Sequence, residues 1–170
     1  MERAGFFRWL CLTIAKAVHY KTIPIFISFM LMSAFLAMFI DSITVILFLA
    51  AITITQGKLL KFDPIPVIIA EIFCSNLGGS STMCGDPPNI IIGTALHYTF
   101  TDFLFNTGVI AILSLVLMIF FFYLCFRKKL NTNNLSKEDI AKMPSPDSAI
   151  TSKRSFIISC IIFLCAVVLL

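Results

Sequence analysis

Residues 74–93 read CSNLGGSSTMCGDPPNIIIG, and they interrupt an apolar stretch that runs from Pro64 to Leu96. The two adjacent prolines break the helical hydrogen-bond ladder, and the glycines allow the backbone to unwind or to approach a ligand closely. Hydroxyl, amide and carboxylate groups in the same run supply hard oxygen ligands, which suit sodium or a proton relay. A proline kink explains two or three such residues but not a run of this length. The run therefore predicts a discontinuous membrane helix with an ion site at its break.

The composition is that of a membrane protein. Of 170 residues, 59% are hydrophobic and 13% are charged, whereas soluble domains have about 45–50% and about 25%. These values exclude a disordered chain or a nucleic-acid-binding tail. The N-terminus lacks the order of regions that marks a signal peptide. Six cysteines without paired spacing predict small packing residues and no resident metal or cofactor. A thiol site for a soft metalloid at Cys74 and Cys84 is the alternative.

Four apolar stretches divide the chain, and all 13 Lys and Arg residues lie outside them. A membrane crossing needs about 20 residues. The third stretch fits one crossing. The first two are too long for one straight crossing, and polar residues interrupt each of them. The fourth is too short, which predicts that the chain is a fragment. The stretches are Thr22–Gln56, Pro64–Leu96, Phe103–Phe126 and residues 156–170.

The basic residues predict the topology, because cytoplasmic loops carry an excess of Lys and Arg. Residues 127–155 contain seven basic residues, and residues 97–101 contain none. Residues 127–155 are therefore placed inside and residues 97–101 outside. Residues 57–63, with Lys58 and Lys61, then lie inside again. The N-terminal segment is also basic, so the first apolar stretch is predicted to be a re-entrant hairpin with its tip at Asp41 and Ser42.

Together these patterns predict an all-α, polytopic membrane protein. A surface helix at the N-terminus is the preferred interpretation, and the tail of an earlier span is the alternative. The predicted segments are a cytoplasmic surface helix (1–21), a re-entrant hairpin (22–56), a discontinuous transmembrane helix (57–96), a transmembrane helix (97–130), a cytoplasmic linker (131–155) and the start of a truncated transmembrane helix (156–170).

Three acidic residues lie inside the apolar stretches: Asp41, Glu71 and Asp86. An ionised carboxylate near a helix centre costs about 2.5–3.5 kcal/mol on insertion scales, so each needs a reason. For Asp41 and Asp86 we expect a cation or proton path. For Glu71, which has no polar neighbour within a turn, we expect a protonated carboxyl in a buried hydrogen bond.

Residues 75–93 resemble the signature of the arsenite and sodium/proton permease family. That family belongs to the ion transporter superfamily, which also contains citrate and dicarboxylate carriers and the pigment-cell P protein. The run that begins at Asp41 is similar to the hairpin tip of the family, and residues 5–16 are similar to the segment before it. Ser42, Val45 and Ala51 depart from the residues that are usual there, which puts the choice of ion in question.

The resemblance implies half of an inverted-repeat transporter, in which a hairpin and a broken helix meet at a mid-membrane site and move across the bilayer like an elevator. The remainder of the transporter and a small ion would be the partners, with the lipid bilayer around them and a homodimer left open. The expected location is the cell (inner) membrane, with the N-terminal segment in the cytoplasm.

From these patterns we expect a secondary active transporter, not an enzyme, that couples a small ion to a sodium or proton gradient. Sodium/proton antiport or efflux of arsenite or a related anion is the preferred interpretation, and a citrate or dicarboxylate carrier is the first alternative. A non-transporting truncated fragment and a membrane-embedded hydrolase are the others. The predicted ion- or substrate-binding residues are Asp41, Ser42, Thr44, Asn76, Gly78, Gly79, Thr82, Gly85, Asp86 and Asn89.

Overall fold

The computed structural model describes residues 21–130, together with residues 9, 12, 13, 16–18, 157, 158 and 161. In this part of the chain every regular element is a helix. The predicted surface helix (1–21), linker (131–155) and last span (156–170) lie largely or wholly outside the described residues.

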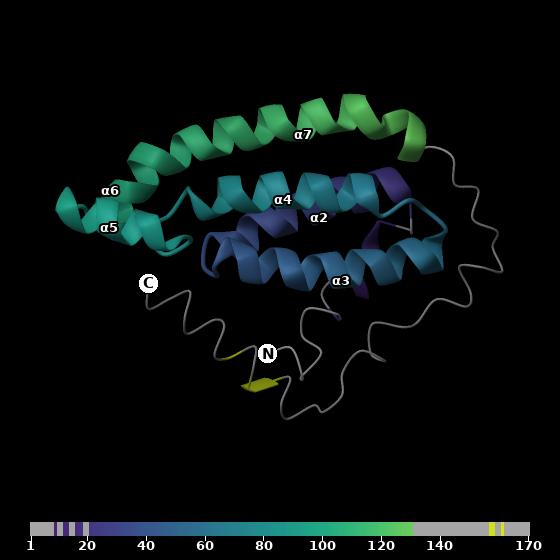
Figure 1. Ribbon diagram of the computed structural model, residues 1–170, viewed down its shortest axis with the longest axis horizontal. Helices are drawn as coiled ribbons and strands as arrows, with labels where there is room; N and C mark the ends of the chain where they lie inside the picture. Colours follow the sequence, from purple (N-terminus) through teal and green to yellow (C-terminus); the bar gives the residue numbers. More distant parts are fainter. Residues whose placement is uncertain are drawn as a thin grey trace.

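The first two helices form a hairpin. α2 (Thr22–Ala37) and α3 (Ser42–Leu60) are joined by a turn of four residues, and they run in opposite directions past each other (Figure 1). Asp41 caps α3, because its side chain accepts a hydrogen bond from the backbone N–H of Thr44. α3 continues to Leu60, beyond the end of the apolar stretch at Gln56, and stops at a left-handed Lys61.

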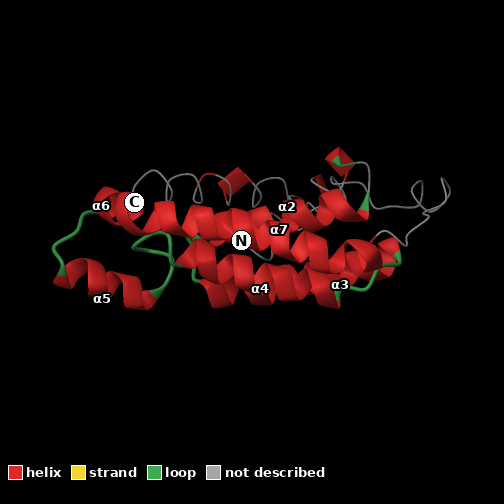
Figure 2. Ribbon diagram, turned by 90° about the horizontal axis from the view of Figure 1, so that it is seen from above, coloured by secondary structure: helices red, strands yellow, loops and turns green. Residues whose placement is uncertain are grey.

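The predicted interruption after the hairpin separates two helices. α4 (Ile65–Gly79) and α5 (Pro87–Ala95) flank a non-helical segment at residues 80–86. α5 begins with two prolines, which tolerate the first turn because its N–H groups have no helical partner. Seen from above, α5 projects beyond the end of α4, with the connecting loop between them (Figure 2).

The last described helices form one long apolar rod. α6 (Phe100–Phe103) begins at a capping box between Thr99 and Asp102, and a π-helical turn, η2 (Leu104–Gly108), leads into α7 (Val109–Leu130). Together they contain an apolar helix of 30 residues. At 1.5 Å per residue it is about 45 Å long and can cross a bilayer. α2 and α4, with 16 and 15 residues, are about 24 Å and 22 Å long and fall short of the roughly 30 Å core.

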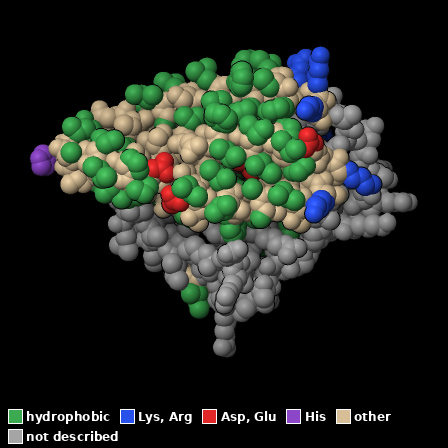
Figure 3. All heavy atoms as spheres, viewed as in Figure 1, with side chains coloured by type: hydrophobic (Ala, Val, Ile, Leu, Met, Phe, Trp, Pro, Cys, Tyr) green, Lys and Arg blue, Asp and Glu red, His purple; other side chains and the backbone are tan. Residues whose placement is uncertain are grey.

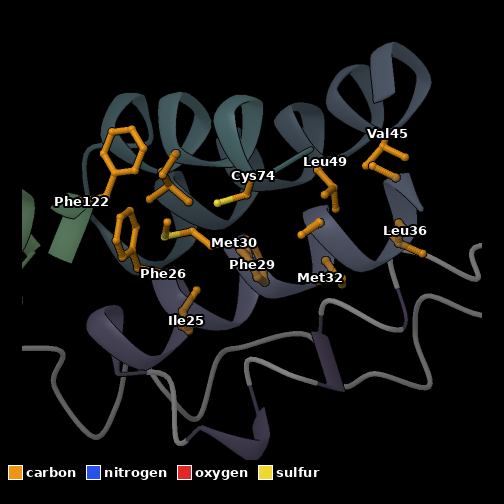
Figure 4. Packing of buried hydrophobic residues seen from close by; sticks show 14 of the residues in the cluster. Ile25, Phe26, Phe29, Met30, Met32, Leu36, Val45, Leu49, Cys74 and Phe122 are labelled. Carbon is orange, nitrogen blue, oxygen red and sulfur yellow. The ribbon is translucent and has the colours of Figure 1, made fainter. Parts of the chain in front are cut away.

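The core lies where α4 packs between the hairpin and α7. Phe26 of α2, Cys74 of α4 and Phe122 of α7 meet there (Figure 4). Phe122 also stacks on Phe126, with ring centres 5.8 Å apart. The outer faces remain apolar: Leu47 of α3 is 71% exposed and Leu117 of α7 is 70% exposed. Surfaces of this kind suit lipid or further helices.

The two ends of the bundle differ in charge. Lys58 lies in the last turn of α3, and Arg127, Lys128 and Lys129 lie in the last turn of α7. Figure 3 shows Lys and Arg side chains gathered at one end of the molecule and a histidine at the other. In the described part of the chain that histidine is His97, in the link between α5 and α6. One end of the bundle is therefore basic, and the other carries no lysine or arginine among the described residues.

Candidate functional site

The hairpin turn and the break after α4 lie against each other. The Ser42 hydroxyl, at the first position of α3, donates a 2.7 Å hydrogen bond to Oδ1 of Asp86. The Thr82 hydroxyl donates to the carbonyl of Met38 in the turn. The Ser75 hydroxyl on α4 donates to the carbonyl of Ser42 at 3.2 Å. These three bonds join two segments about 40 residues apart in the sequence.

Asp86 lies at the start of two helices. It is the N-cap residue of α5, and its carboxylate also accepts from the first residue of α3. Helix N-termini carry a partial positive charge, so both helices stabilise negative charge here. The other carboxylate oxygen, Oδ2, lies against Gly79, where an added Cβ atom would collide with it. Gly79 is therefore small because the carboxylate occupies the space that a side chain would need.

Asp41 caps α3 beside this contact. Its Oδ2 accepts from both the N–H and the hydroxyl of Thr44, at 3.0 and 3.2 Å. Asp41 is half-buried, and it directly precedes Ser42. The structure thus places two acidic side chains at the beginning of α3, one from the hairpin and one from the break. Oxygen ligands in this arrangement suit a cation or a proton.

Asn89 and Thr82 hold the break in shape. The Asn89 side-chain amide donates to the carbonyls of Gly79 and Thr82, both at 2.8 Å. The Thr82 hydroxyl accepts from the N–H of Gly85 at 3.2 Å. Two of the carbonyls that the break frees are therefore already bonded to the first turn of α5.

Gly78 and Gly85 allow close approach between backbones. A Cβ atom on Gly78 would collide with the backbone of Ala34, so α4 touches α2 directly at this position. A Cβ atom on Gly85 would lie 2.7 Å from the carbonyl oxygen of Ala37, at the end of α2. Asn76 lies in the last turn of α4 with its side chain exposed. These three residues surround the meeting of turn and break and do not contact Asp86 through a hydrogen bond.

Ser75 was not singled out at the sequence level; it is fully buried and connects α4 to the first residue of α3. Its place among polar residues inside an apolar stretch was the available signal. The buried hydrogen bond expected for Glu71 is present: the Thr53 hydroxyl donates to its Oε1 at 2.6 Å. The Ser33 hydroxyl donates to the backbone carbonyl of Glu71 at 2.8 Å.

The comparisons with known proteins agree in pointing to transporters. A family model described as a citrate transporter matches residues 1–170. The chain is 33% identical over 118 residues to a 46 kDa membrane protein of Mycobacterium leprae, which is 69% of this chain and 28% of that protein. It is 30% identical over 119 residues to an uncharacterized transporter of Mycobacterium bovis, with coverages of 70% and 28%. No solved structure matches.

A further relative matches a shorter part of the chain. The P protein of Homo sapiens is 34% identical over 91 residues, which is 54% of this chain and 11% of that protein. The chain spans 28% of the length of the mycobacterial relatives. The region of similarity therefore corresponds to one part of a longer protein in each relative.

Proposed function

The chain belongs to the citrate transporter family, and from this membership we propose that it forms one half of the ion-binding site of a secondary active transporter. The family and its named relatives are transporters and not enzymes. Membership also makes the chain part of an integral membrane protein. The proposed activity is movement of a small ion coupled to a sodium or proton gradient.

The hydrogen bond from Ser42 to Asp86 supports this proposal most directly, because it joins the two interruptions of the apolar chain. Irregular backbone at membrane depth persists only where protein or a water-filled cavity surrounds it. Here it contacts the end of α2, the hairpin turn and the start of α3, and it presents an acidic side chain and hydroxyl groups. Asp41 and Asp86 would bind the coupling cation or proton, with Ser42 and Thr44 as further oxygen ligands.

A sodium/proton exchanger is the preferred form of the proposal. In the described residues the site contains two carboxylates and no lysine or arginine, so its own charge is negative and calls for a cation. Efflux of arsenite or a related anion is the second form. It would use the N-termini of α3 and α5, which favour negative charge.

A citrate or dicarboxylate carrier is the alternative that the family description favours. A carboxylate substrate would carry the same charge as Asp41 and Asp86 and would be repelled by them. The coupling cation would therefore have to bind and neutralise the two side chains first. Binding of substrate would then depend on sodium or on low pH.

The proposal is tested by replacing Asp86 with Asn in the complete protein and measuring flux in liposomes. Sodium and pH gradients are imposed separately, and sodium, arsenite and citrate are offered in separate arms. We expect membrane insertion to be retained and coupled flux to be lost, since the amide keeps the shape of the side chain but neither its charge nor its proton site. Unchanged flux with unchanged pH and sodium dependence would overturn the role of Asp86. Absence of flux in the unmodified protein would favour the non-transporting alternative.

The remaining parts of the transporter are part of the same proposal. Because the chain spans 28% of its mycobacterial relatives, an inverted second repeat would supply the facing half of the site. The apolar outer faces of α3 and α7 would contact lipid, that second repeat or a second protomer. The basic end of the bundle would face the cytoplasm, in line with the positive-inside rule.

A further inference from the structure

A second acidic group lies deep inside the helices. Glu71 of α4 is fully buried, and its two nearest polar contacts come from different legs of the hairpin. Thr53 of α3 donates to Oε1 at 2.6 Å, and Ser33 of α2 donates to the backbone carbonyl at 2.8 Å. Both Thr53 and Ser33 are themselves fully buried. One residue thus joins α4 to both legs of the hairpin in an environment without water contact.

The other carboxyl oxygen of Glu71 has no partner. Oε2 is buried and makes no hydrogen bond to the described residues. Native proteins rarely leave a buried polar atom unpaired, so Oε2 needs a partner, such as a water molecule, that the described residues do not supply. An ionised carboxylate supported by a single hydroxyl would be very unfavourable in this interior. A proton on Oε2 removes that charge and leaves Oε1 as the acceptor from Thr53.

No charged group in the surrounding helices compensates Glu71. α2 carries no titratable side chain, and α3 carries only the exposed Lys58 in its last turn. On α4 the neighbouring titratable group is the buried thiol of Cys74, one turn after Glu71. α7 carries Tyr123, Cys125 and the basic residues of its last turn. In the described residues Glu71 forms no ion pair, and only a hydroxyl contacts its carboxyl group.

Polar groups also lie along the way from Glu71 to Asp86. Ser75 follows Glu71 by one turn of α4, is fully buried and donates to the Ser42 carbonyl. The Ser42 hydroxyl then donates to Asp86. On the other side of Glu71, away from Asp86, Gln56 follows Thr53 by one turn of α3 and is buried with its side-chain carbonyl oxygen unpaired. Buried groups of this kind are the ones that admit a water molecule between them.

We propose that Glu71 is a proton-binding site inside the helical bundle, separate from Asp41 and Asp86, and that its proton resides on Oε2. Binding adds one proton from water to the carboxylate, and release returns it to water. The proton stabilises the packing of both hairpin legs on α4, and its loss weakens that packing because a charge is left in the core. The site does not rest on the proposed transport activity.

The test is infrared difference spectroscopy on the complete protein in liposomes, which requires no flux. The carbonyl stretch of a protonated carboxylic acid is followed from about pH 6 to pH 10, a range that covers carboxyl groups displaced by burial. We expect a band that is present near neutral pH, decreases in alkaline buffer and is missing in Glu71→Gln. Asp86→Asn serves as the control and should retain this band.

Two results would overturn the proposal. One is that no band near neutral pH is lost in Glu71→Gln, which would mean that Glu71 is ionised. The other is a Glu71 band that stays unchanged up to about pH 10, which would mean a permanently neutral structural group. If the band behaves as expected while Asp86→Asn leaves flux unchanged, the proton site stands and the proposed function fails.

A second variant tests which carboxyl oxygen carries the proton. Thr53→Val removes the hydroxyl that donates to Oε1 and keeps the size of the side chain nearly unchanged. If the proton is on Oε2, Oε1 is the carbonyl oxygen, and the loss of its hydrogen bond should move the carbonyl band to a higher frequency. An unchanged frequency in Thr53→Val would contradict the assignment of Oε1 as the bonded oxygen and Oε2 as the protonated one.

Discussion

At the residue scale, the position of the Asp86 carboxylate depends on a hydrogen-bond donor on one side and on the absence of a side chain on the other. Ser42 donates to one oxygen, and Gly79 leaves room for the other. A hydrogen bond to a charged group contributes about 1.5–3 kcal/mol. Because Ser42 and Gly79 together fix the orientation of the Asp86 carboxylate, a small change in either residue should move it.

Gly79→Ala is the first test of this arrangement. The added methyl group collides with Oδ2 of Asp86 and must push the carboxylate away from α4. We expect coupled flux in liposomes to fall about tenfold or more, which corresponds to about 1.4 kcal/mol, while expression and insertion stay normal. The matched control is Gly93→Ala, where the new methyl group meets only the flexible side chain of Met83. Equal flux in the two variants would argue against a positioned carboxylate.

Ser42→Ala is the second test. Loss of the hydroxyl removes the 2.7 Å bond to Asp86, so that the carboxylate is no longer held at the start of α3. We expect coupled flux in liposomes to fall about tenfold, and Ser42→Thr, which keeps a hydroxyl, to restore it. Equal flux in the wild type and in Ser42→Ala would show that this bond does not position Asp86.

At the element scale, α2 and α4 form the closest pair in the bundle because Gly78 faces the backbone of Ala34. Helices associate in membranes chiefly through such small-residue contacts, since the surrounding lipid offers no hydrophobic driving force. The sequence predicted Gly78 as a ligand contact. Its partner lies 44 residues away, so local spacing could not reveal that it also packs two helices together.

Gly78→Val tests this contact. Side-chain atoms at position 78 would force α4 away from Ala34, and we expect a loss of about 1–3 kcal/mol of stability, seen as a lower midpoint of thermal unfolding in detergent. The control is Asn76→Ala, two residues earlier, where the side chain is exposed. A similar midpoint for both variants would contradict the direct contact of the two backbones.

Local patterns predicted the positions of the helices better than their ends. The two interruptions, at Asp41 and at the break before Pro87, follow from residue chemistry that no continuous helix accommodates. The end of α3 did not follow, because Gly57 stays helical and the chain instead leaves the helix at Lys61, with the N–H of Phe62 bonded to the Gly57 carbonyl. The buried hydrogen bond expected for Glu71 is present, but local spacing could not identify its donor, Thr53, which lies 18 residues away.

At the scale of the whole molecule, charge is distributed along the long axis. The basic residues gather at the ends of α3 and α7, whereas the link between α5 and α6 has none. The apolar stretches and the basic segments between them predicted this arrangement.

Cysteine labelling tests the orientation. In a cysteine-free background, single cysteines replace Lys58 and His97, both exposed and at opposite ends of the bundle. A membrane-impermeant maleimide applied to intact cells should label position 97 and should reach position 58 only after permeabilisation, as the positive-inside rule requires. Labelling of position 58 in intact cells, with none at 97, would invert the proposed topology.

The described part of the candidate site contains two acidic side chains and no lysine or arginine, and this affects how readily an ion gradient could leak through the empty carrier. Asp41 and Asp86 enter a region whose lysines and arginines all lie outside the apolar stretches. A vacant site would have to carry uncompensated negative charge through hydrocarbon, which is strongly unfavourable. We therefore expect the empty carrier to return slowly, so that an ion gradient is not dissipated by futile cycling. A low rate of leakage would then follow from the charge of the empty site, and no separate gate would be needed.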